Sequence, residues 1–260
     1  MHQKEFADKI KLILSNDSSI TGMAVGGSWL TNEMDEFSDL DIIIVTKYRI
    51  SENTNKMFEY AKSFGQLLTG FTGEHVGEKR LLICLYDNPL LHVDLKFLTL
   101  DEFKVRIENP QIILDEDDQL KKVIEETEFE FQYPDYQWFE ERFWVWVHYT
   151  LQKIGRGELF EATDVLNYFN TTIICPLLHI KYNNLPRGVR KAEVLLPIDD
   201  LEKLKKNLPD YSKRSILESL ENCILMYREL REEIYPKNIK IHFETEIRVL
   251  KYLNEIKLKV

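Results

Sequence analysis

Residues 39–45 constrain the fold of this chain more than any other segment. They read Asp-Leu-Asp-Ile-Ile-Ile-Val, so two carboxylates open a run of aliphatic and mostly β-branched side chains. Such a run is typical of a strand that is buried inside a sheet. Side chains alternate along a strand, so Asp39 and Asp41 point to the same face with their Cα atoms roughly 6.5–7 Å apart. We therefore expect a buried strand that carries two carboxylates at its start.

The first hundred residues alternate helical and strand patterns around this segment. Further strands are expected at 20–25, 80–86 and 91–98, and helices at 6–14 and 53–68. This alternation predicts an α/β (α+β) unit built on a mixed sheet. From about residue 134 helical patterns take over, at 136–153, 159–182, 199–206, 212–234 and 244–258. We expect two domains, 1–115 with the sheet and 116–260 as an all-α helical bundle.

Charge and composition narrow the classes of partner. The chain has 260 residues and a formal net charge of -10, which argues against a long nucleic acid and favours a cationic small molecule. Three widely spaced cysteines lie in apolar stretches and are expected to be buried, reduced thiols. The absence of a long uncharged apolar segment predicts no membrane span, and we expect a cytoplasmic protein. The oligomeric state stays open between a monomer and a homodimer.

The strand expected at 20–25 ends in Gly26-Gly27-Ser28. Glycine has no Cβ, so the backbone here can approach a ligand closely. The N–H groups of the following turn can converge on a phosphate, and the Ser28 hydroxyl adds a donor. Gly27 and Ser28 are therefore candidate nucleotide-binding residues.

A third carboxylate, Asp94, lies in the strand expected at 91–98. Alternation places it on the same face as His92 and Lys96, with Val93 and Leu95 on the other face. An ionised aspartate in such an apolar strand is costly unless it is paired or bound to a metal. If this strand lies beside residues 39–45, three carboxylates can share Mg²⁺ or Mn²⁺, which prefer hard oxygen ligands.

These motifs resemble the nucleotidyltransferase superfamily that shares the DNA polymerase β palm. The family pattern is Gly-Ser, a variable spacer, Asp-x-Asp and a later strand carboxylate. Gly27, Ser28, Asp39, Asp41 and Asp94 match it residue by residue. The specific motifs cover roughly residues 1–100. A palm followed by a helical domain also resembles the antibiotic nucleotidyltransferases, which adenylylate aminoglycosides or lincosamides.

The resemblance implies an enzyme with a nucleotidyltransferase palm in which Asp39, Asp41 and Asp94 are catalytic and hold the metal. It would transfer a nucleoside monophosphate onto a hydroxyl of an aminoglycoside- or lincosamide-like molecule and release pyrophosphate. The expected nucleotide is AMP, taken from ATP. ATP or another NTP would be the co-substrate, with Mg²⁺ or Mn²⁺. Two alternatives stay open: transfer onto a protein, or a catalytically idle nucleotide-binding module.

Two features of the helical half are weaker candidates. Arg187, Arg190 and Lys191 follow an Asn-Asn-Leu-Pro turn and could reach a triphosphate, since guanidinium groups suit phosphate geometry. A solvated basic loop explains them equally well. Glu140 and Glu141, on an aromatic-rich helix, could attract a cationic acceptor, although charged helix faces are usually only solvated.

Overall fold

The structure is a computed structural model that describes residues 2–260. The chain divides into two compact units, one ending at Gln132 and the other beginning at Tyr133. The predicted domain limits of 1–115 and 116–260 differ from these units in residues 116–132. A helix in that stretch, α4 (Gln119–Glu126), packs against strands of the first unit.

The first unit contains a mixed six-stranded sheet with the strand order β3-β4-β5-β2-β1-β6. Only β2 and β5 pair in parallel, and every other neighbouring pair is antiparallel. The strands are β1 (Ile20–Val25), β2 (Leu40–Thr46), β3 (Gln66–Gly73), β4 (Glu78–Asp87), β5 (Leu91–Thr99) and β6 (Gln111–Asp115). The helices are α1 (His2–Leu14), α2 (Thr54–Phe64), α3 (Leu100–Phe103) and α4 (Gln119–Glu126), with short turns η1 (Gly27–Trp29), η2 (Ile50–Glu52) and η3 (Glu74–Val76).

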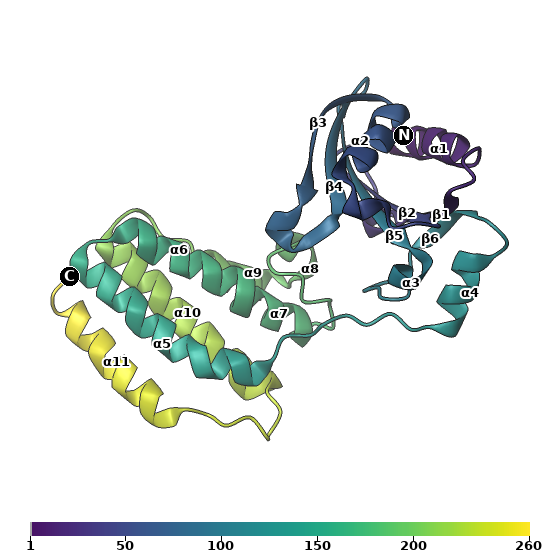
Figure 1. The fold of residues 1–260 in the computed structure, drawn as a ribbon. Coiled ribbons are helices and arrows are strands. Elements are labelled where there is room, and N and C mark those ends of the chain that lie inside the picture. The colour runs from purple at the N-terminus through teal and green to yellow at the C-terminus, as the bar shows by residue number, and fades with distance from the viewer. Residues whose placement is uncertain (1) are drawn as a thin grey trace. The chain divides into compact units, whose positions relative to one another are not determined.

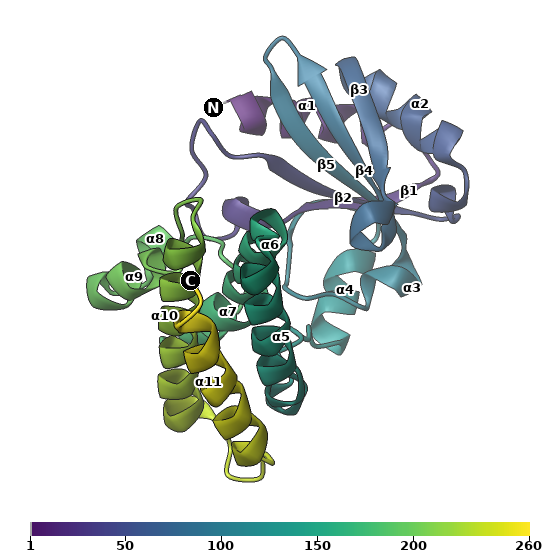
Figure 2. The same cartoon turned by 90° about the vertical axis from the view of Figure 1, so that its left-hand side faces the viewer.

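Helices cover both faces of this sheet, as Figures 1 and 2 show. On one face α1 and α2 bury a core that includes Ile10, Phe64, Ile42 and Leu95. On the other face a smaller cluster forms where α3 and α4 cover the later residues of β2 and β5. Asp41 of β2 and Asp94 of β5 belong to neither of these clusters and are half-buried.

Four of the expected strands are confirmed, at β1, β2, β4 and β5, and two others were missed. The predicted helix at 53–68 was too long, because α2 ends at Phe64 and Gln66 already begins β3. Gly65 separates the two elements, and a Cβ on it would lie 3.2 Å from Phe6 and 3.3 Å from Tyr86. The second missed strand, β6, pairs with β1 and forms the edge of the sheet.

The second unit is helical, as expected. Its helices are α5 (Tyr136–Arg156), α6 (Leu159–Phe169), α7 (Cys175–Lys181), α8 (Ala192–Leu195), α9 (Ile198–Lys205), α10 (Lys213–Ile234) and α11 (Phe243–Lys257). A π-helical turn, η4 (Asn170–Ile174), joins α6 to α7. Figure 1 shows α5, α10 and α11 running side by side, and they share one core with α6 and α7.

A buried ionic cluster ties α5, α10 and α11 together. Glu140 is 1% exposed and accepts hydrogen bonds from the Tyr227 hydroxyl at 2.6 Å and the His242 backbone N–H at 3.0 Å. Arg231 lies 3.4 Å from Glu140 and 2.8 Å from Glu246. Buried charges persist when they are paired and hydrogen-bonded in this way. Glu140 is therefore a structural residue and not a surface group that attracts an acceptor.

Gly22 of β1 offers a test of the sheet. A Cβ at this position would lie 2.6 Å from the Leu114 backbone oxygen of β6 and 2.8 Å from Leu120 of α4. Because a backbone atom must move, we expect Gly22→Ala to lower the free energy of unfolding by about 1–3 kcal/mol. Gly155→Ala in helix α5 is the control, since its Cβ would make an ordinary 3.5 Å contact with the Ile256 side chain of α11. This control should stabilise by about 0.5–1 kcal/mol; equal effects of both changes in urea unfolding would contradict the packing of β1 on β6.

Candidate active site

The parallel pairing of β2 with β5 brings two of the predicted carboxylates together. Asp41 and Asp94 are direct register partners, and neighbouring strands lie about 4.8 Å apart. Both side chains are half-buried, whereas their neighbours Leu40 and Val93 are buried on the opposite face. The prediction that the strand of Asp94 lies beside that of Asp41 is confirmed. Asp39 is half-buried and lies directly before the first residue of β2.

The Gly26–Gly27 turn packs against Asp41. The Gly26 N–H donates a hydrogen bond of 3.1 Å to the Asp41 backbone oxygen. Gly27 has a φ of 62°, and a Cβ there would overlap Asp41 Oδ2 and lie 3.1 Å from Asp41 Cγ. Only glycine combines this backbone conformation with the space that the carboxylate needs. The two glycines therefore fix where the Asp41 side chain lies.

Ser28 lies in the η1 turn directly after Gly27 and is half-buried. Its backbone oxygen accepts a hydrogen bond from the Glu33 N–H at 3.3 Å. Within residues 2–260 its hydroxyl has no hydrogen-bond partner, so it is free to donate to a ligand. Gly27, Ser28, Asp41 and Asp94 thus come from three separate segments of the first unit.

One neighbouring carboxylate was missed from the sequence. The Gly27 N–H, expected to face a phosphate, donates a hydrogen bond of 3.0 Å to Glu108 Oε1. Glu108 lies in the loop between α3 and β6, in a stretch without any motif. Only the unpredicted pairing of β6 with β1 brings this loop to the turn, so no local pattern could have identified it.

His92 lies on the face of β5 that carries Asp94, as alternation predicted. Its Nε2 lies 3.0 Å from Asp94 Oδ1, and its side chain is 51% exposed against 22% for Asp94. The imidazole therefore contacts the carboxylate from the solvent side. A histidine in this position restricts the rotation of the carboxylate that it contacts.

The aspartates can supply part of the coordination shell of a divalent ion. Among residues 2–260, no three His, Cys, Asp or Glu side chains are grouped closely enough to form a metal cage. The three aspartates are therefore not a ready-made cluster, although Asp41 and Asp94 are adjacent. Mg²⁺ usually takes one or two carboxylates and completes its shell with waters and substrate phosphates. Two in-register carboxylates on one face of the sheet suit that manner of binding.

The basic residues predicted to bind the triphosphate lie in the second unit. Arg187, Arg190 and Lys191 occupy the segment between α7 and α8, where the chain turns at Gly188 with a φ of 63°. Arg190 and Lys191 are exposed, and Arg187 is half-buried. Their role at the nucleotide stays a prediction.

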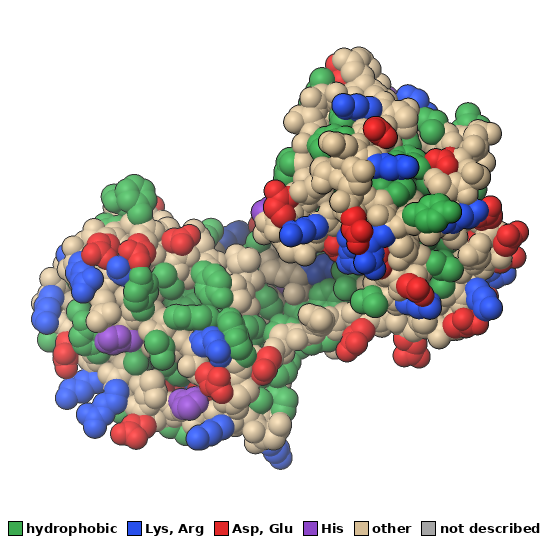
Figure 3. Space-filling model, in the orientation of Figure 1, with side chains coloured by type: hydrophobic (Ala, Val, Ile, Leu, Met, Phe, Trp, Pro, Cys, Tyr) green, Lys and Arg blue, Asp and Glu red, His purple; other side chains and the backbone are tan. Residues whose placement is uncertain are grey.

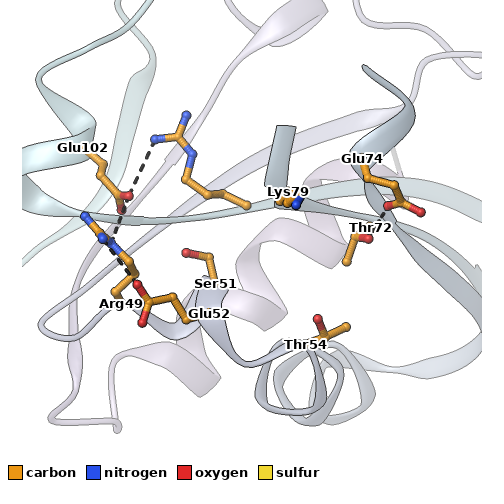
Figure 4. Close-up of a pocket in the computed structure, with 9 residues that line it drawn as sticks. Arg49, Ser51, Glu52, Thr54, Thr72, Glu74, Lys79 and Glu102 are labelled. Atoms are coloured by element: carbon orange, nitrogen blue, oxygen red, sulfur yellow. Dashed lines mark hydrogen bonds and ion pairs between the residues drawn. The ribbon is translucent and has the colours of Figure 1, made fainter. Parts of the chain in front are cut away.

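A cavity of about 580 Å³ lies at the other end of the β2–β5 pair (Figure 4). Its Arg49 and Arg80 lie 3.3 Å and 3.8 Å from the Glu102 carboxylate. Burial acts to raise the pKa of the nearby Glu78, but hydrogen bonds from Arg80 and Lys96 lower it to about 2. Carboxylates of the protein therefore neutralise the positive charge of both guanidinium groups. Ion pairs within the fold therefore hold the charged side chains at this cavity. The cavity lies at the opposite end of β2 from Asp41.

Three further expectations concern membrane spans, cysteines and surface charge. No helix within residues 2–260 is both long and apolar enough to cross a bilayer. The three cysteines, Cys84, Cys175 and Cys223, are buried and unpaired, as expected. Acidic and basic side chains are interspersed on the face shown in Figure 3, so the net negative charge is not gathered there.

Comparison with known proteins identifies the family. The model of a family described as streptomycin adenylyltransferase matches residues 1–256. The chain belongs to this family. It is therefore an enzyme of the nucleotidyltransferase class, and the family's activity is transfer of a nucleotidyl group onto a small molecule. The comparison with curated proteins found no match.

Solved structures of nucleotidyltransferases are also similar, at low identity. An aminoglycoside 6-adenyltransferase from Bacillus subtilis is 18% identical, with 98% of each chain covered and a TM-score of 0.39. A spectinomycin adenyltransferase from Enterococcus faecialis, solved with ATP and spectinomycin, is 13% identical over 98% of this chain and 99% of that one, with a TM-score of 0.30. A nucleotidyltransferase-like protein from Exiguobacterium sibiricum is 10% identical over 98% and 89%, with a TM-score of 0.33. The family assignment rests on the family model and not on these scores.

Gly27→Ala tests the contact between the turn and Asp41. The new methyl group would displace the Asp41 carboxylate, and the left-handed backbone would cost about 1–3 kcal/mol. Gly77→Ala is a matched control, because Gly77 also has a positive φ, of 77°, but nothing lies within 4 Å of its Cβ position. We expect a similar loss of stability in both variants and a loss of nucleotidyl transfer only in Gly27→Ala. Full activity of Gly27→Ala would show that Asp41 is not positioned by this turn.

Proposed function

We propose that this enzyme transfers AMP from ATP onto a hydroxyl of an aminoglycoside-like molecule. The observation that carries the proposal is the register pair Asp41–Asp94, with the Gly26–Gly27 turn packed against Asp41. The acceptor oxygen would attack the α-phosphorus of ATP and give up its proton. The bond from that phosphorus to the bridging oxygen would break, and pyrophosphate would leave.

We propose that Asp41 and Asp94, with Asp39 beside them, hold Mg²⁺ or Mn²⁺. A bound ion of this kind shields phosphate charge and lowers the pKa of a coordinated hydroxyl. The chain itself contributes the fixed carboxylates and the Ser28 hydroxyl, which can donate to a phosphate oxygen. His92 restrains Asp94 from the solvent side. Arg187, Arg190 and Lys191 are proposed to contact the triphosphate.

The family and the charge of the chain support an aminoglycoside-like acceptor. The family's description names streptomycin, and the similar structures are named for aminoglycosides or spectinomycin. A net charge of -10 favours association with a polycationic molecule of this kind. Lincosamide-like acceptors belong in the same test. A cytoplasmic location and a monomeric or dimeric state stay predictions.

Removing single carboxylates tests the assignment. We expect Asp39→Asn, Asp41→Asn and Asp94→Asn each to reduce transfer by about a hundredfold or more, because each weakens the hold on the metal. Pyrophosphate release with each of the four NTPs, Mg²⁺ and a panel of aminoglycosides and lincosamides measures this. Asp101→Asn serves as the control, since its carboxylate is 89% exposed and lies after β5.

The outcomes separate the alternatives. If the three variants retained full activity with an accepted substrate, the carboxylates would not be the catalytic set. If ATP stabilised the protein against heat but no acceptor gave turnover, the chain would be a nucleotide-binding module. Circular dichroism should show an unchanged fold in all variants, because the substitution keeps the size of each side chain.

A further inference from the structure

Glu108 contacts the Gly26–Gly27 turn through its carboxylate, and no sequence motif accounts for it. Strand β6 starts at Gln111, which pairs with Val25 at the end of β1. The residues before β6 therefore lie beside the residues after β1, where the turn begins. Pro110 has no N–H to continue the ladder, and the preceding loop is free to direct Glu108 at the turn.

The contact is specific in its geometry. Glu108 Oε1 accepts the Gly27 N–H at 3.0 Å, and a Cβ on Gly26 would lie 3.2 Å from the same oxygen. That Gly26 Cβ position is also 3.9 Å from Asp41 Cβ. The glutamate oxygen and the aspartate side chain thus approach the same pair of glycines. A hydrogen bond with an ionised acceptor is about twice as strong as a neutral one.

A second bond holds the same turn to the first residue of β6. The Trp29 indole N–H donates to Gln111 Oε1 at 2.8 Å. The η1 turn is therefore attached at its first residue through Glu108 and at its last through Gln111. Since the Asp41 carboxylate rests against Gly27, a shift of the turn would shift the space available to that carboxylate.

We propose that Glu108 is a positioning residue of the nucleotide site. Its carboxylate holds the Gly27 N–H, fixes the turn and so sets the position of the Asp41 carboxylate against which the turn packs. This inference rests on the proposed function, because Asp41 is the group through which Glu108 acts. It assigns to the loop before the edge strand β6 a part in shaping the site.

Two other roles make different demands on Glu108. A general base or a metal ligand needs the charged carboxylate itself. A group that merely occupies the phosphate position would weaken nucleotide binding, and its removal would then tighten that binding. A positioning bond needs only an acceptor oxygen of the right length, which glutamine retains and alanine lacks.

The test measures the affinity of the full-length protein for Mg²⁺ with α,β-methylene-ATP by isothermal titration calorimetry. We expect Glu108→Gln to bind about threefold more weakly than the wild-type protein, and Glu108→Ala about tenfold or more. Amide hydrogen exchange at Gly27 should follow the same order, fastest in Glu108→Ala. Ile107→Ala is the control, because this exposed neighbour makes no polar side-chain bond. Its affinity and exchange rate should match those of the wild-type protein.

Each other result overturns the inference. Equal affinity in Glu108→Ala and the wild-type protein, or tighter binding in the variant, would refute it while leaving the nucleotide site intact. A loss in Glu108→Gln as large as that in Glu108→Ala would show that the charge and not the hydrogen bond matters. If the wild-type protein did not bind the nucleotide at all, the proposed function would fail and the inference with it. Unchanged melting temperatures exclude a loss of fold as the cause.

Discussion

The site depends on one constraint, the parallel register of β2 with β5. Parallel strands require a crossover between them, and here the chain from Lys47 to Leu90 supplies it with α2, β3 and β4. The register places Asp41 directly opposite Asp94, so two charges meet without any flexible loop between them. Hydrophobic residues on the far face, covered by α1 and α2, hold the strands in place. A slip of one residue would turn these carboxylates into the core.

The two carboxylates lie outside the hydrophobic clusters that cover the rest of the sheet. Helices α3 and α4 cover the later residues of β2 and β5, where Val45 and Leu98 are buried. Near the start of β2 the Gly26–Gly27 turn takes the place of a covering helix. Half-burial costs an ionised carboxylate less desolvation than full burial in a hydrophobic core would. One end of this face is therefore packed by helices, and the other end carries the candidate site.

Much of this arrangement was predictable from local patterns. The apolar run after Asp41 and the alternation around Asp94 identify β2 and β5, because both strands are central and buried on at least one face. The edge strands were not predictable in the same way. Nearly all residues of β3 and β6 are exposed or half-buried, so their sequences carry no hydrophobic period. Glu108 and Glu140 gain their roles only through contacts 81 and 87 residues away, which no local pattern records.

The central claim is that Asp41 and Asp94 act as a pair on the metal of the nucleotide. Anomalous diffraction from crystals grown with Mn²⁺ and α,β-methylene-ATP tests it most directly. The account predicts a manganese peak in contact with oxygens of both carboxylates, at about 2.1–2.2 Å, and with a phosphate oxygen. A manganese peak bound elsewhere in the chain, with nucleotide present and both carboxylates free of it, would contradict the account.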